Sequence, residues 1–425
     1  MMIQTLASVF SLLLGTLILV LGNSLLGIVL PVRMGLEHVP EVYSGLVMSA
    51  YYLGFVLGSW QIQMLIKRAG HIRAFAALAA ILTSAAMLHA LVFDIWVWAG
   101  LRVLNGLCMA GLYAIIESWL NVKSSNENRG QVLSIYVVTV YTASFSGQFL
   151  VNIGDINGTT LFCIVGLATA LSLVPVVLTR VAGPEIDKIR AMSLLGLYRA
   201  SPLGVVVTCG AGLLSGAFYG LGAIYANELG LSVFQVSLFM GAPIFGGFAL
   251  QYPIGRLSDR YDRRTVLLAV LIGALAASVA LALISMRAGP FYGTLAAAFV
   301  FGGCLAAIYP IAVSQVYDYI DRALMVAASG GLLLIWAMGA VAGPLLASSF
   351  MGWMGPKAFF IYLSTVSLIL VIFTRYRMIR RLARPADQQT GFVPVQTTSA
   401  IAGALDPRTD PLPEFYYDDA DPGDR

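Results

Sequence analysis

Apolar stretches of about 18 residues or more recur through the first 375 positions of the chain, separated by short segments that carry its charges. A helix of that length crosses a hydrocarbon core of about 30 Å. The stretches lack the alternation of a transmembrane β-barrel, so we predict an all-α integral membrane protein. Twelve transmembrane helices are expected, at residues 6–31, 42–66, 74–93, 95–120, 131–153, 159–180, 202–225, 233–254, 265–286, 291–317, 324–349 and 357–374.

The basic residues of the loops gather on one side of the predicted membrane. With the beginning of the chain inside, only Arg33, Arg287 and Lys357 fall in loops on the outer side. Short loops rich in Lys and Arg stay in the cytoplasm, so we expect a multi-pass protein of the cell inner (cytoplasmic) membrane with both termini cytoplasmic. The first apolar run reaches Pro31 without a basic region before it or a cleavage site, and we expect it to be retained as a helix.

Composition narrows the function classes. Of 425 residues, 59% are apolar and 11% are charged, whereas a soluble domain carries roughly 25% charged residues. The net charge of +4 lies in short loops, which fits membrane topology and lipid contact and not nucleic-acid binding. The sequence has no phosphate-binding loop, its three histidines are scattered, and its four cysteines lie inside apolar runs. We therefore expect no enzyme, no metal site and no cofactor.

The chain repeats itself after about 190 positions, which indicates two related halves. Residues 63–73, QMLIKRAGHIR, correspond to residues 255–264, GRLSDRYDRR, and Gly106 corresponds to Gly302. We predict two pseudo-symmetric six-helix bundles, 1–180 and 201–384, joined by a cytoplasmic linker at 181–200, with the site between them. Glycines also recur every four residues, at 54 and 58, at 212, 216 and 220, and at 339 and 343, which predicts closely packed helices.

Residues 385–425 form a cytoplasmic tail in which the apolar signal stops. Its prolines and acidic residues predict disorder. The aromatic cluster Phe415, Tyr416 and Tyr417 fits either a docking peptide or a solvated tail, and we assign it no role.

The charged loop after the eighth predicted helix carries a motif. The segment GRLSDRYDRR (residues 255–264) resembles the loop signature G-x-L-x-D-R-x-G-R-[KR] of the major facilitator superfamily, with Asp262 in place of the second glycine. The equivalent loop in the first half keeps Arg68, Gly70 and Arg73. It has Lys67 where the aspartate belongs.

Two further segments carry the same resemblance. Arg102, Gly106 and Ala110 match the superfamily's R-x-x-x-G motif in the fourth helix. The stretches ESWLN (117–121) and NENRGQVLSIY (126–136) look like the YcaD-like branch of the superfamily. The resemblance covers residues 1–380 and implies a transporter that works by alternating access, with its two halves rocking about a central cavity.

Charged residues near the cytoplasmic loops are candidates for a gate. Carboxylates beside arginines form charge-assisted hydrogen bonds, and these must break if the two halves separate on that side. One cluster would combine Asp259, Asp318 and Asp321 with the second-half arginines, and another would combine Glu117 with the first-half arginines. The alternative is that the basic residues only fix topology and face lipid headgroups. The predicted gate consists of Arg68, Gly70, Arg73, Arg129, Gly255, Asp259, Arg260, Arg263, Arg264 and Asp318.

Arg102 lies about six residues into the fourth predicted helix, roughly 10 Å deep. An ionisable residue at that depth usually faces the bundle interior and is functional, although a long side chain can also extend to the surface. Asp94 is a candidate partner, whereas Glu117 lies some 22 Å further along the same helix. Amides and aromatic residues of the helices either contact a substrate or pack against neighbouring helices. The candidate substrate or coupling residues are Asn23, Tyr51, Arg102, Tyr113, Glu117, Tyr141, Gln148, Tyr219, Gln251 and Trp336.

The sequence as a whole predicts a monomeric secondary transporter of a small molecule. Efflux is favoured on the resemblance alone, and a cavity arginine favours an anionic group on the cargo. Coupling to protons stays open, because no carboxylate is expected at the middle of the membrane. Two alternatives also stay open: a facilitative uptake carrier, and a membrane receptor or scaffold that presents its C-terminal tail to a partner.

Overall fold

The computed structural model describes residues 2–125, 127–178, 192–287, 289–380, 384–385 and 388–409. Within these ranges, 12 helices are long and apolar enough to cross a membrane, which confirms the predicted number. They are α1 (Met2–Leu36), α2 (Glu41–Ala69), α3 (His71–Leu91), α4 (Ile95–Val122), α5 (Arg129–Phe149, continued by the 3-10 turn η1, Leu150–Ile153), α6 (Thr160–Val177), α8 (Pro202–Glu228), α9 (Val233–Arg260), α10 (Arg263–Met286), α11 (Phe291–Tyr317), α12 (Met325–Met354, preceded by η2, Arg322–Leu324) and α13 (Ala358–Arg380). The short helix α7 (Leu194–Ala200) precedes α8, and η4 (Ala400–Leu405) follows α13.

The helices begin where side chains can satisfy the free N–H groups of the first turn. Asp94 accepts hydrogen bonds from the backbone of Trp96 and Val97 at the start of α4. At the start of α9, Ser232 and Gln235 form a reciprocal capping box. These caps fix the loops on one face of the bundle and so set the register of α4 and α9 within it.

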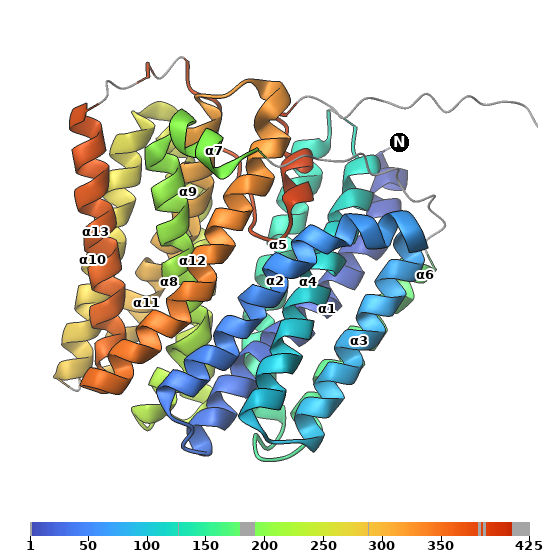
Figure 1. Ribbon diagram of the computed structural model, residues 1–425, viewed down its shortest axis with the longest axis vertical. Coiled ribbons are helices and arrows are strands. Elements are labelled where there is room, and N and C mark those ends of the chain that lie inside the picture. Colours follow the sequence, from blue (N-terminus) through green and yellow to red (C-terminus); the bar gives the residue numbers. More distant parts are fainter. Residues whose placement is uncertain are drawn as a thin grey trace, which may run out of the picture.

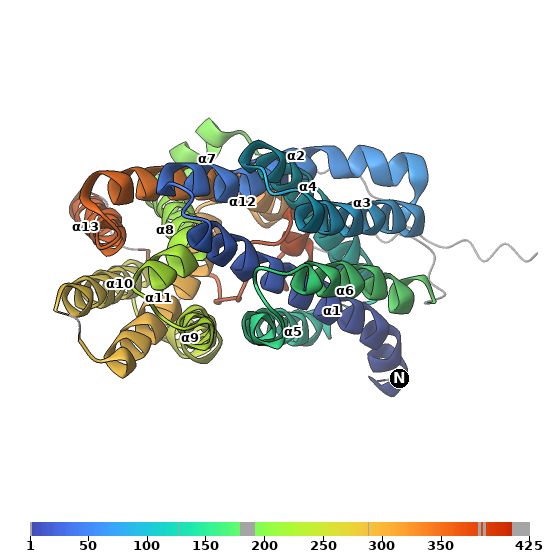
Figure 2. The same ribbon diagram turned by 90° about the horizontal axis from the view of Figure 1, so that it is seen from below.

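The twelve helices form two halves, α1–α6 and α8–α13, which lie side by side in Figure 2. Their internal packing is equivalent: α2 packs on α4 as α9 packs on α11, α1 on α5 as α8 on α12, and α3 on α6 as α10 on α13. The halves meet along α2 with α12 and along α5 with α9, which are themselves equivalent pairs. The repeat read from the sequence is therefore a repeat of helix contacts.

Glycines allow the tightest helix crossings in both halves. A Cβ atom at Gly106 of α4 would overlap the carbonyl oxygen of Tyr51 in α2. At the corresponding Gly302 of α11, it would overlap the backbone of Pro243 in α9. Each half thus contains at least one backbone-to-backbone contact that tolerates no side chain, which ties α2 to α4 and α9 to α11 as paired units.

The two faces of the bundle differ in how closely the halves approach. We call the face with the beginning of α1 and the end of α13 the terminal face, at the top of Figure 1. Near the opposite face, Ser49 of α2 donates to the carbonyl of Val341 in α12 at 2.6 Å. On the other side of the interface there, Asn152 donates to Ser237 of α9 at 2.9 Å. The halves are thus bonded to each other directly near the opposite face.

On the terminal face, the chain after α13 lies between the halves (Figure 1). The sequence predicts disorder for 385–425, and the structure corrects this for residues 388–409, which pack against α4, α5 and α12 through η4. The reason is two short apolar stretches inside the tail, at 392–395 and 400–405, whose buried residues are Val393, Val395, Ile401, Ala402, Ala404 and Leu405. The acidic and proline-rich residues that dominate its composition come mostly after it. Residues 410–425, with the aromatic cluster at 415–417, lie outside the described residues.

The close crossing at Gly106 predicts that leucine is far more destabilising at this position of α4 than at Gly100. Gly106→Leu forces α2 and α4 apart, and we expect a loss of about 3 kcal/mol or more of stability, because overpacking a tight contact costs 1–3 kcal/mol even where neighbours can yield. Gly100→Leu is the control, because a Cβ atom at Gly100 would meet no other atom within 4 Å. Size-exclusion profiles and apparent melting temperatures of the purified variants would compare them, and equal behaviour would refute the close crossing.

Candidate functional site

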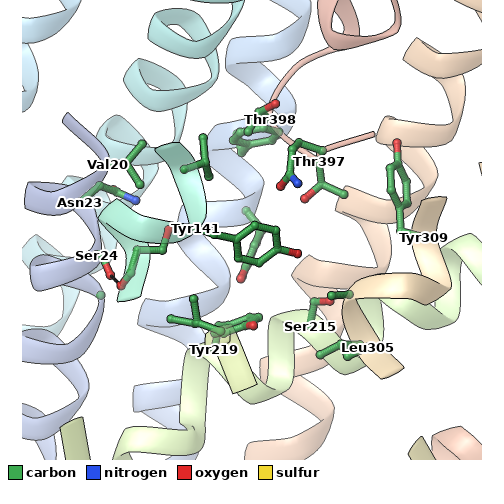
Figure 3. Close-up of a pocket in the computed structure, with 18 of the residues that line it drawn as sticks. Val20, Asn23, Ser24, Tyr141, Ser215, Tyr219, Leu305, Tyr309, Thr397 and Thr398 are labelled. Atoms are coloured by element: carbon green, nitrogen blue, oxygen red, sulfur yellow. Dashed lines mark hydrogen bonds between the residues drawn. The ribbon is translucent and has the colours of Figure 1, made fainter. Parts of the chain in front are cut away.

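A central cavity of about 310 Å³ lies between the two halves. Its wall comes from α1, α2, α4 and α5 of the first half and from α8, α9, α11 and α12 of the second. Figure 3 shows Tyr141 pointing into it, with Asn23 and Ser24 on one side and Tyr309 on the other. The predicted candidates that line it are Asn23, Tyr51, Arg102, Tyr113, Tyr141, Gln148, Tyr219, Gln251 and Trp336. Glu117 does not line it.

Arg102 is a buried cation in this wall, with 4% of its surface exposed. Its Nη1 donates to Asn105 at 3.2 Å, and its guanidinium carbon lies 4.5 Å from the centre of the Tyr51 ring, a cation–π geometry. Its Nε has no hydrogen-bond partner, and none of the ion pairs among the described residues includes it. The prediction that Asp94 is the partner of Arg102 is wrong, because the Asp94 carboxylate caps α4 instead.

The cavity amides divide into two kinds. Gln251 accepts from the Tyr141 hydroxyl at 3.2 Å and donates to the carbonyl of Ala306 at 3.0 Å, so it ties the two halves together. Gln148 donates to Ser24 at 2.7 Å, but its oxygen has no partner. The oxygen of Asn23 is also without one. A ligand that offers donors to these two oxygens would satisfy buried groups that the described protein leaves open.

Sequence reasoning missed one wall of the cavity. Residues 395–398 of the C-terminal segment line the cavity, and Figure 3 shows Thr397 and Thr398 at its upper end. The apolar run around Val393 and Val395 was the available signal, since a solvated tail has no reason to carry it. The small polar residues Ser24, Ser144 and Ser215 were missed as well.

Glu117 is fully buried between the cavity and the terminal face. It accepts a hydrogen bond from Tyr136 at 2.6 Å and further ones from the hydroxyls of Thr398 and Ser399. The predicted first-half cluster is not assembled, because Arg68 and Arg73 are exposed. Arg129 is buried and interacts electrostatically with Asp406 of the C-terminal segment instead.

The second-half cluster is assembled in part. Arg263 and Asp318 form an ion pair at 2.5 Å with 1% and 2% of their side chains exposed, and Arg263 also donates to the carbonyl of Ser314 at 2.9 Å. Asp318 accepts from the backbone N–H of Thr390 at 2.8 Å. Asp259 accepts from the backbone N–H of Phe392 at 2.6 Å. Both Asp259 and Asp318 therefore bind the C-terminal segment, and Asp318 also keeps the predicted pairing with a second-half arginine.

The remaining gate residues take structural positions. Gly70 has φ +77°, a conformation that favours glycine, where α2 turns into α3. Its equivalent Asp262 has φ −53° and caps α10 through the N–H of Arg264. The replacement of the signature glycine thus supplies a helix cap. Arg260 and Asp321 are exposed, and Gly255 faces the Phe392 ring, which a Cβ atom there would overlap.

Comparison with known proteins agrees with this geometry. The sequence model of the Major Facilitator Superfamily matches residues 12–285 and 203–411. The "Uncharacterized MFS-type transporter YcaD" of Escherichia fergusonii is 28% identical over 369 residues, which covers 86% of this chain and 94% of that protein. The protein of the same name from Escherichia coli matches to the same extent. The resemblance to the YcaD-like branch is confirmed.

Solved structures share the fold at low identity. The nucleoside transporter NupG superposes with a TM-score of 0.72 at 13% identity, over 88% of this chain and 99% of its own. A bacterial homolog to the human lysosomal transporter Spinster, in an inward-facing and unoccupied conformation, gives 0.67 at 16% identity, over 96% and 99%. At such identity the likeness concerns the arrangement of helices and not the cargo.

The buried ion pair predicts that loss of Asp318 strongly lowers the stability, and that a second substitution at Arg263 restores it. Asp318→Ala leaves the Arg263 charge buried without its partner, and we expect a loss of about 3–5 kcal/mol of stability, measured as a drop in apparent melting temperature. Adding Arg263→Met removes the orphaned charge and should recover most of that loss. Asp321→Ala, at an exposed position, is the control. If Asp318→Ala melted like the control, the pair would contribute nothing.

Proposed function

We propose that this protein exports a small organic anion through its central cavity. The premise is that the chain belongs to the Major Facilitator Superfamily and is a transporter of the alternating-access type. The observation that carries the cargo class is Arg102. Burying a charge without a partner is costly, and Arg102 lies in the wall with a free Nε and no carboxylate in an ion pair with it among the described residues. A carboxylate or similar group on the cargo would complete this site with charge-assisted hydrogen bonds.

The rest of the wall suits an organic body attached to that group. Aromatic rings from both halves supply apolar surface. Tyr52 and Trp336, for example, meet across the interface with their ring centroids 6.0 Å apart. The open oxygens of Asn23 and Gln148 would take donors of the cargo. A volume of about 310 Å³ lies at the lower end of the range for small-molecule sites, which favours a metabolite-sized molecule.

The terminal face is the cytoplasmic one in this proposal. The ends of α2 and α13 and the start of α3 on this face carry Lys67, Arg68, Arg73, Arg375 and Arg377. Basic residues that flank membrane helices stay on the cytoplasmic side. The protein then lies in the inner membrane with its outer apolar side chains in lipid. Since one chain encloses the whole cavity, we propose that it works as a monomer.

Exchange against protons is our proposal for the energy source. The buried carboxylates of the described residues are Glu117, Asp318 and Asp406. Asp318 pairs with Arg263, and Asp406 pairs with Arg408 at 2.5 Å, whereas Glu117 is held by hydroxyl groups. A carboxylate that has no cationic partner can gain and lose a proton without breaking an ion pair, so we assign the coupling to Glu117.

The two alternative functions, a facilitative uptake carrier and a receptor or scaffold, require different features of the structure. A facilitative uptake carrier would use the same cavity without Glu117, and the nucleoside transporter NupG shares the fold. A receptor or scaffold would have to present its tail, but residues 388–409 are packed against the helices. Only residues beyond 409 would remain for a partner.

Matched pairs of compounds test the cargo class. We expect carboxylic acids from a metabolite library to raise the melting temperature of the purified protein, and the amides of the same acids to raise it less, because binding to the folded state alone is stabilising. Arg102→Ala should weaken the affinity for such an acid about 30-fold or more, as expected for removing one partner of a buried charge pair.

Arg287→Ala is the control for this test, because it removes an exposed positive charge on the opposite face. Equal shifts by acids and amides, or undiminished binding to Arg102→Ala, would refute the anionic cargo. The family assignment would stand in either case.

Coupling and the scaffold alternative are tested in proteoliposomes with an acid found in this way. A chain that ends at Pro385 should still transport it, which a scaffold would not. In that shortened chain, Glu117→Gln should keep exchange of labelled for unlabelled acid but lose its acceleration by a pH gradient. Acceleration that survives the substitution would show that Glu117 is not the coupling group.

A further inference from the structure

The C-terminal segment, residues 388–409, is bound to both halves of the transporter. In the first half, the hydroxyls of Thr398 and Ser399 donate to Glu117 of α4. The segment also places Asp406 near Arg129 at the start of α5. These contacts bind the segment to the half formed by α1–α6.

The second half holds the beginning of the segment. The backbone N–H of Thr390 donates to Asp318 at 2.8 Å, and that of Phe392 donates to Asp259 at 2.6 Å. Further along the segment, Arg408 donates to the Ser314 hydroxyl of α11 at 2.7 Å. Three carboxylates of the bundle, Glu117, Asp259 and Asp318, thus face N–H or O–H donors of the segment.

Arg408 is also fixed within the segment. It pairs with Asp406 at 2.5 Å, and it donates to the carbonyl of Gly391 at 2.8 Å, which joins the two ends of the segment. Burial alone would lower the pKa of Arg408, but Asp406, Tyr317 and Asp318 together outweigh this and raise the pKa above its ordinary value. The segment is therefore a closed, charged loop and not an extended strand.

The apolar side chains of the segment are buried against the helix bundle. Val393, Val395 and Leu405 are exposed by 7% or less. The ring of Phe392 occupies the space that Gly255 leaves in α9. Figure 1 shows the segment, at the red end of the colour scale, lying between α12 and the helices of the first half.

The position of the segment closes the cavity. Residues 395–398 form its wall toward the terminal face (Figure 3), and the bonds of α2 to α12 and of Asn152 to α9 join the halves near the opposite face. A molecule could not pass between the cavity and the terminal face along this path without displacing the segment.

We propose that the terminal face is a binding site for the chain's own C-terminal segment, which acts as a removable plug: bound, it shuts the cavity and holds the two halves together, and cargo exchange at this face requires its release. The proposal goes beyond the proposed function, since it needs neither a particular cargo nor a direction. It needs only that the halves separate on the terminal face, as alternating access requires.

A single cysteine in the cavity tests the plug. Ala306→Cys places a thiol in the wall, in a chain whose four native cysteines are replaced by alanine. We expect a soluble maleimide to label it about tenfold faster or more when the chain ends at Pro385 than when it is complete, because removal of the plug shifts the population to the open state. A chain that ends at Thr409 keeps the plug and should label at the rate of the complete chain.

Two additions keep the test decisive. Gly255→Leu, which leaves no room for Phe392, should also speed labelling in the complete chain, while Gly100→Leu should not. A synthetic peptide of residues 388–409 should slow labelling of the shortened chain again, and the same peptide with Thr398→Ala and Ser399→Ala should protect less. Equal labelling of shortened and complete chains would overturn the proposal. So would a shortened chain that labels fast but is indifferent to the peptide, because the segment would then be a fixed part of the wall.

Discussion

A charge buried among membrane helices needs a partner, and the described part of this transporter is organised around how its buried charges find theirs. Arg263 and Asp318 satisfy each other within one half. Glu117 is satisfied in part by hydroxyl groups that arrive from beyond the last membrane helix. Arg102 has an aromatic ring and an amide but no carboxylate in an ion pair with it. Under the proposals made above, these three arrangements are a fixed contact, a contact that the segment makes and releases, and a site for an anionic group of the cargo.

The loop motif at residues 255–264 contains both a candidate gate carboxylate and the binding position of the C-terminal segment. Asp259 and Gly255 belong to the motif that resembles the superfamily's loop, and the carboxylate binds the backbone of Phe392 while the glycine makes room for its ring. The same residues that could latch the halves are thus the residues that seat the C-terminal segment. A latch made of a chain segment can contact both halves at once, as the bonds of this segment to Glu117 of α4 and to Asp259 of α9 show.

The sequence was sufficient for the framework because hydropathy, basic loops and repeated glycines are local signals. The number of helices is confirmed, and the equivalence of Gly106 and Gly302 reappears as two equivalent crossings. Most of the candidate cavity residues also lie in the wall, because polar side chains in apolar helices turn inward. What could not be read was pairing between distant segments: Asp94 caps its own helix, Arg68 and Arg73 remain exposed, and Thr398 reaches Glu117 across 281 positions. The overall composition of the tail is also acidic and rich in proline, so that its two short apolar stretches, at 392–395 and 400–405, do not stand out.

The place of the C-terminal segment in the chain has a consequence for biosynthesis. Residues 388–409 leave the ribosome after all twelve helices, so the bundle can insert and its halves can associate before anything occupies the terminal face. On the plug proposal, each new molecule then passes through an interval in which its cavity is open toward the terminal face. If the segment acts as the proposed plug, its docking completes the closure of the cavity, and leak through new molecules depends on how quickly docking follows synthesis.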